Sequence, residues 1–159
     1  GGRSTLVTGH IGTREGAWRV ARYIEHEWEQ VDILLNAAPM QSAEEYAEDS
    51  GIVVSEVLPG MQERGWGRIV TVLSSVPTHP RQGPGAESYR SRDMDEWSAG
   101  SHSGVLVNQI VVQQTNPDAA SVEPNRAPYQ ATSAAAWLAL SLCSRRNLSI
   151  TGVTFAVLS

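Results

Sequence analysis

The chain has 159 residues, 41% of them apolar, and a formal net charge of −5 with no basic stripe. This length and composition suit one globular domain over residues 1–159, and the acidic balance disfavours nucleic-acid binding, because phosphate contacts need clustered basic side chains. A single cysteine excludes an internal disulfide, no apolar run approaches the roughly 20 residues of a membrane span, and no signal-peptide pattern opens the chain, so we expect a cytoplasmic protein without a membrane partner.

Apolar segments with strand and helix patterns alternate along the chain, which predicts a parallel α/β sheet. The first is Thr5–Thr8, a short strand that ends at Gly9. Thr13 can then cap a helix. The next predicted strand is Val31–Leu35, which is apolar almost throughout, as a parallel strand covered on both faces should be. Apolar positions of the intervening helix recur at helical spacing, at Ala17, Val20, Ala21, Ile24 and Trp28.

The middle of the chain contains a second helix and a third strand. Ser42 and Glu45 have the spacing of a capping box at the start of this helix, which we expect to continue to Met61. Two glycines end it, and Arg68–Leu73 is the next strand. The proline- and glycine-rich stretch Val76–Ser88 is predicted to be a loop.

The last third of the chain repeats the pattern. Val105–Val112 is a predicted strand, Gln113–Ala127 a polar loop, Ala131–Leu142 a helix rich in small residues, and Val153–Val157 the final strand. The expected core consists of apolar residues from these elements: Leu6, Val7, Ile33, Leu34, Leu35, Val57, Ile69, Val70, Val72, Val107, Ile110, Leu138 and Phe155.

Four blocks resemble the short-chain dehydrogenase/reductase family: Val31–Pro39 (VDILLNAAP), Met61–Ser75 (MQERGWGRIVTVLSS), Gly104–Val112 (GVLVNQIVV) and Tyr129–Val157. They follow the family's order and together cover about two fifths of the chain. The resemblance implies an α/β fold with a Rossmann-like parallel sheet of about five strands, truncated relative to the family. It also implies descent from enzymes that oxidise alcohols or reduce carbonyls with a nicotinamide cofactor.

The N-terminal segment fits the family in two registers. It can be the first strand with a glycine-rich turn, although Gly12 and Gly16 do not continue from Gly9 at the family's spacing. It can also be the third strand, with His10 at a position where the family usually has an aspartate. The second register needs no gap before Asn36 and is preferred. We then expect the strand to pair beside Val31–Leu35, because an open strand edge needs a partner.

Neither register supplies the glycine cradle that brings a pyrophosphate to a helix N-terminus. If NAD(P) binds, Gly9, Gly12 and Asn36 are the candidate contacts. We expect that no cofactor binds, with NAD(P) as the alternative. The four histidines show no metal-ligand spacing, so no metal site is expected.

The resemblance places two candidate catalytic residues, Ser75 and Tyr89. In the family the serine holds the substrate oxygen, the tyrosine is the acid and a lysine four residues later lowers the tyrosine pKa. Here that position is Asp93, which would raise the pKa of the tyrosine instead. The alternative is a turn serine and a loop tyrosine without a catalytic role.

The resemblance and the altered residues leave three alternative functions. The first is a non-redox enzyme, of isomerase, cyclase or lyase type, that acts on a small carbonyl- or hydroxyl-bearing metabolite. The second is a pseudoenzyme or assembly partner of a full-length relative, and the third is an NAD(P)-dependent oxidoreductase. We also expect the chain to form an oligomer, either with copies of itself or with a relative. Its simplest form is a twofold dimer that uses the helix ending at Met61 or an uncovered sheet face.

Overall fold

The computed structural model describes residues 4, 6, 13–37, 43–75, 97–99, 103–113 and 127–158. No described helix is long and apolar enough to cross a membrane. The regular elements of these residues alternate as the sequence predicts: α1 (Arg14–Trp28), β1 (Ile33–Asn36), α2 (Ala43–Glu63), β2 (Gly67–Ser75), β3 (Val105–Gln113), α4 (Ala127–Cys143) and β4 (Thr154–Leu158).

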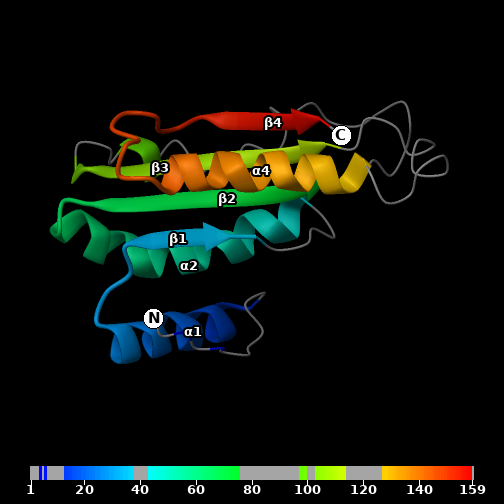
Figure 1. Cartoon of the computed structure of the whole chain (residues 1–159). Coiled ribbons are helices and arrows are strands. Elements are labelled where there is room, and N and C mark those ends of the chain that lie inside the picture. Colours follow the sequence, from blue (N-terminus) through cyan, green and yellow to red (C-terminus); the bar gives the residue numbers. More distant parts are fainter. Residues whose placement is uncertain are drawn as a thin grey trace.

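The four strands form one parallel sheet in the order β1-β2-β3-β4 (Figure 1). The parallel α/β sheet expected from the sequence is therefore confirmed, with four strands in the described part of the chain. β2 and β3 are the two central strands and pair along nine positions, from Gly67 beside Val105 to Ser75 beside Gln113. β1 is shorter and lies at one edge of the described sheet.

One face of the sheet packs against α2. Ile69, Val105 and Val107 form a fully buried cluster there with Val54 and Met61 of the helix. The turn after α2 needs glycine, since Gly65 has a positive φ of 68°. Met61 lies directly against Gly67, where a Cβ would overlap the methionine side chain. The helix therefore ends close to the start of the strand that follows it.

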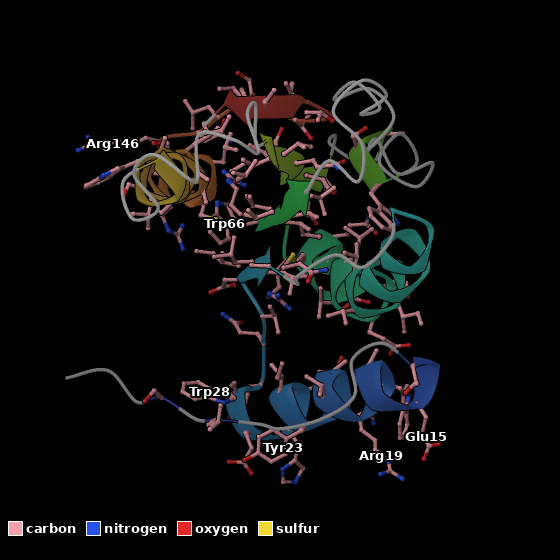
Figure 2. All side chains as sticks on the ribbon, turned by 90° about the vertical axis from the view of Figure 1, so that its right-hand side faces the viewer. Glu15, Arg19, Tyr23, Trp28, Trp66 and Arg146 are labelled. Atoms are coloured by element: carbon pink, nitrogen blue, oxygen red, sulfur yellow. The ribbon has the colours of Figure 1, made fainter. Side chains whose placement is uncertain are left out.

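The opposite face packs against α4, so that the two helices sandwich the central strands (Figure 2). Val70 and Ile110 meet Ala135, Ala139 and Leu142 there. α2 and α4 connect strands in the same direction along the sheet, yet they lie on opposite faces, so these two crossovers have opposite hands. Crossovers in parallel sheets are right-handed as a rule, so one of the two is an exception.

The face of the sheet that packs against α4 is covered over β3 but not over β1. Every residue from Val105 to Val111 is buried, so β3 is covered on both sides. β1 is not. Ile33 and Leu35 share the face of α4, but the helix does not reach them, and they are 47% and 53% exposed. Their assignment to the core was wrong for this reason.

The N-terminal expectation is also corrected. Leu6, at the centre of the predicted strand Thr5–Thr8, is in no regular structure and is 89% exposed. Leu6 is therefore not a core residue. Its neighbour Val7 lies outside the described residues.

The cap of α1 is confirmed, because the Oγ1 of Thr13 accepts a hydrogen bond from the backbone N–H of Gly16 at 3.1 Å. Ala17 and Ala21 are buried, and α1 packs on α2 rather than under the centre of the sheet (Figure 1). Small side chains at these positions let the two helices approach closely.

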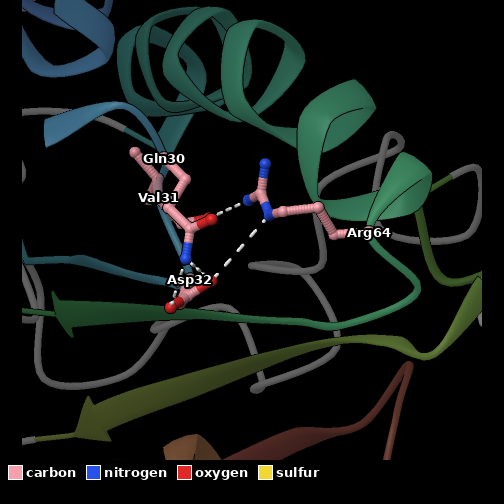
Figure 3. Close-up of polar contacts among 4 residues, drawn as sticks. All are labelled: Gln30, Val31, Asp32 and Arg64. Atoms are coloured by element: carbon pink, nitrogen blue, oxygen red, sulfur yellow. Dashed lines mark hydrogen bonds and ion pairs between the residues drawn. The ribbon is translucent and has the colours of Figure 1, made fainter.

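The chain entering β1 is tied to the end of α2 (Figure 3). Arg64 Nη2 donates to the carbonyl oxygen of Val31 at 2.6 Å, and its Nε lies 3.9 Å from a carboxylate oxygen of Asp32. Gln30 donates to both oxygens of the same carboxylate at 3.2 Å. These contacts hold the segment between α1 and β1 against the end of α2.

Candidate functional site

The carboxyl ends of the two central strands meet at one pair of residues. Ser75 ends β2 and is level with Gln113, which ends β3. β1 stops earlier, because its last residue, Asn36, is level with Thr71. At a rise of about 3.3 Å per residue, Asn36 lies roughly 13 Å back along the strand direction from Ser75.

The next described segments after these two strand ends pack on opposite faces of the sheet: Trp97 contacts the buried cluster on the α2 face, and α4 lies on the other face. In open parallel sheets, ligands bind outside the carboxyl ends of the strands. Ser75 and Gln113 mark this edge for the two central strands.

A row of polar residues crosses the sheet below this edge. The strand register brings one residue from each strand to the same level, on the face of α2: Asn36, Thr71, Gln109 and Thr154. Thr71 and Gln109 are buried, and the hydroxyl oxygen of Thr154 is buried without a hydrogen-bond partner in the described structure. Burying uncharged polar groups costs free energy unless they are hydrogen-bonded. This row can offer donors and acceptors, but no charge.

This row of polar residues was not predicted from the sequence. Its signal was present, since Thr71, Gln109 and Thr154 each lie within an apolar run. Only the register shows that the three residues are level with one another. A single polar residue in a strand does not indicate which neighbour it meets.

The residues predicted for catalysis and cofactor binding are only partly placed. Ser75 is at the carboxyl end of β2, opposite Gln113, and Asn36 is in the polar row rather than beside Ser75. Tyr89, Gly9 and Gly12 lie outside the described residues, so the pairing of Ser75 with Tyr89 stays a prediction. Among the described residues, no group of three histidine, cysteine, aspartate or glutamate side chains could hold a metal ion.

A second polar cluster lies at the opposite, amino-terminal edge of the sheet. Arg68 is 4% exposed, and its guanidinium group donates only to backbone carbonyl oxygens. Nη1 reaches Gly67 at 2.7 Å and Gly104 at 3.1 Å, and Nη2 reaches Asn147 at 2.8 Å. The buried Nε has no partner in the described structure.

The same guanidinium group lies 4.7 Å from the ring centroid of Trp66, and that of Arg145 lies 4.5 Å from the same centroid. Burial lowers the pKa of Arg68, and the positive charge of Arg145 lowers it further. Burial raises the pKa of the Cys143 thiol, and the charge of Arg68 opposes that rise. The cluster therefore holds two cations near one ring.

Parallel strands joined by helices on both faces, with a site at the carboxyl ends, define a Rossmann-like α/β domain. Two solved structures share this fold over 99% of the chain. One is a protein from Burkholderia xenovorans assigned to the short-chain dehydrogenase/reductases, with a TM-score of 0.72, 20% identity and 73% of its own length matched. The other is hydroxysteroid dehydrogenase from Escherichia coli, with a TM-score of 0.72, 17% identity and 76% of its length matched.

No protein-family model matches the sequence, and no curated protein is similar to it at a significant level. At identities of 20% and below, the two structures establish a common fold. The resemblance found in the four sequence blocks is thus confirmed at the level of the short-chain dehydrogenase/reductase fold.

Proposed function

We propose that this chain is a divergent short-chain dehydrogenase/reductase relative that acts as a non-redox enzyme of isomerase, cyclase or lyase type. Its substrate is a small metabolite with a carbonyl or hydroxyl group. One observation carries the proposal: Ser75 and Gln113 end the two central strands side by side, at the carboxyl edge of the parallel sheet. This is where parallel sheets bind small molecules, and the resemblance assigns the substrate-holding serine to the same residue.

In the proposed mechanism, the Ser75 hydroxyl holds the substrate oxygen by a hydrogen bond. Tyr89 then serves as a neutral hydroxyl donor, because Asp93 replaces the lysine that would stabilise a phenolate. No electrons are exchanged with a nicotinamide in this reaction.

Two features of the sequence support a reaction without NAD(P). The glycine spacing after Gly9 is broken, and Asp93 stands where the family has a lysine. The redox alternative rests on the common fold with hydroxysteroid dehydrogenase. A titration with NADPH decides between the non-redox and the redox function.

A thermal-shift screen tests the proposal. We expect NADH and NADPH to leave the melting temperature of the wild type unchanged, whereas at least one small aldehyde, ketone or alcohol raises it in a saturable way. A ligand that binds only the folded state at 100 times its Kd stabilises by about 2.7 kcal/mol. Ser75→Ala and Tyr89→Phe should abolish the shift produced by that compound.

Ser141→Ala is the matched control, because this serine lies on α4 and donates to the carbonyl of Trp137 at 2.9 Å. It should keep the full shift. A dissociation constant for NADPH in the micromolar range would establish the redox alternative instead. A compound that shifts Ser75→Ala as much as the wild type would remove the assignment of the site.

We further propose that the chain forms a twofold dimer through the uncovered part of β1. Ile33 and Leu35 are apolar and half exposed on an edge strand, and a second copy presents the same strip in a self-complementary way. Assembly with a relative is the alternative, and it would support the pseudoenzyme function.

Light scattering coupled to size exclusion measures the assembly directly. We expect the wild type to elute with twice the mass of the 17.2 kDa chain, and Leu35→Asp to elute as a monomer. Leu148→Asp changes an equally apolar residue that is exposed beyond the end of α4, and should stay dimeric. A monomeric wild type at micromolar concentration contradicts the proposal.

A further inference from the structure

Trp66, Arg68 and Arg145 form a group, called here the Arg68 cluster, that the proposed enzyme function does not use. It lies at the amino-terminal edge of the sheet, at the start of β2 and in the turn after α4. Ser75 lies at the other end of the same strand. The cluster is therefore separated from the candidate site by the length of β2.

The Arg68 guanidinium is incompletely satisfied. An arginine side chain carries five N–H donors. Three are used by the carbonyls of Gly67, Gly104 and Asn147, which leaves the N–H of Nε and one of Nη2 without a partner among the described residues. Buried charges in proteins are usually paired with an opposite charge, since an uncompensated one is costly.

No carboxylate of the described residues lies within ion-pair distance of Arg68 or Arg145. Instead, the two cations share the ring of Trp66, which holds the Arg145 side chain in place by a cation–π contact. The adjacent Arg146 extends away from the domain (Figure 2). A concentration of positive charge is unexpected in a chain whose net charge is −5.

The carboxyl end of α4 can balance only part of this positive charge. Cations are favoured near the carboxyl end of a helix, but the whole macrodipole amounts to about half an elementary charge. One terminal carbonyl of α4, that of Leu142, already accepts a hydrogen bond from Asn147 Nδ2 at 3.1 Å. Two or three arginines exceed what this helix end can neutralise, so the described part of the cluster carries positive charge that its described neighbours do not balance.

We propose that the Arg68 cluster binds a phosphate group. Arg145 donates to the phosphate oxygens, because its fork of N–H groups matches them and it is exposed. Trp66 orients Arg145, and Arg68 contributes its buried charge to the field at the site. The phosphate is either free or part of a phosphorylated metabolite.

Isothermal titration with inorganic phosphate and with glycerol 3-phosphate, at constant ionic strength, tests the site. We expect saturable binding to the wild type. If inorganic phosphate binds more tightly, the natural ligand is free phosphate; if glycerol 3-phosphate binds more tightly, it is a phosphorylated metabolite. Arg145→Gln should weaken binding at least tenfold. Arg146→Gln makes the same change one residue away, off the Trp66 ring, and should alter affinity by less than twofold.

Two further variants complete the test. Trp66→Phe keeps an aromatic ring and should retain binding within a few-fold, and Ser75→Ala should bind phosphate as the wild type does, whatever the fate of the proposed catalytic site. Absence of saturable binding by the wild type overturns the proposal. Equal losses in Arg145→Gln and Arg146→Gln also overturn it, since they indicate general attraction to surface charge.

Discussion

Ile69→Asp is expected to prevent folding. Ile69 is fully buried on the central strand β2, in the cluster that joins α2 to the sheet. A carboxylate there has no described cation to pair with in this cluster, and an unpaired buried charge costs at least several kcal/mol. Because domains of this size are stable by only about 5–15 kcal/mol, the loss removes most of the stability. Circular dichroism and urea unfolding measure it.

Ile150→Asp is the matched control for this substitution. Ile150 lies in the connection before β4 and is 46% exposed, so the same carboxylate remains in contact with water. We expect a change in unfolding free energy of no more than about 1 kcal/mol. A soluble, fully folded Ile69→Asp protein would show that the α2 face is not the core.

Gly104→Ala should have the second-largest effect. Gly104 precedes β3 with a φ of 78°, a conformation that alanine adopts only with strain. A Cβ at this position would overlap the carbonyl oxygen of Gly65, which is backbone and cannot move aside alone. The start of β3 and the turn after α2 would have to separate. We expect a loss of about 3 kcal/mol or more in urea unfolding.

Gly65→Ala separates the two causes of that loss. Gly65 has a similar φ of 68°, but a Cβ added there would have a backbone oxygen at 3.9 Å as its nearest neighbour, which is an ordinary contact. The variant therefore suffers conformational strain alone, about 1 kcal/mol. Equal losses in the two glycine variants would mean that the close approach at Gly104 does not contribute.

Much of the fold could be predicted because its signals are local. The cap at Thr13 involves a residue only three positions further along the chain, Gly16. The strand patterns at β2 and β3 depend on runs of mostly apolar residues. Ser75 was identified from a block of neighbouring residues. Each of these inferences needs only a short stretch of chain, and the structure confirms the elements on which they rest.

The polar row and the Arg68 cluster could not be predicted in this way. Gln109 meets Thr71 only because β3 pairs with β2 in one register, and a shift by one residue would send it to the other face. Arg145 meets Arg68 only because α4 ends above the start of β2. Contacts between residues far apart in sequence depend on packing, which no single segment encodes.

By itself, the sequence determined the type of fold, a parallel α/β sheet with its elements in the observed order, because periodicity and apolar runs act within each element. The tertiary structure alone decided which faces are covered. β1 is as apolar in sequence as β3, yet Ile33 and Leu35 remain exposed while β3 is buried on both sides. The difference is the position of α4, since a strand is buried only where another element lies over it.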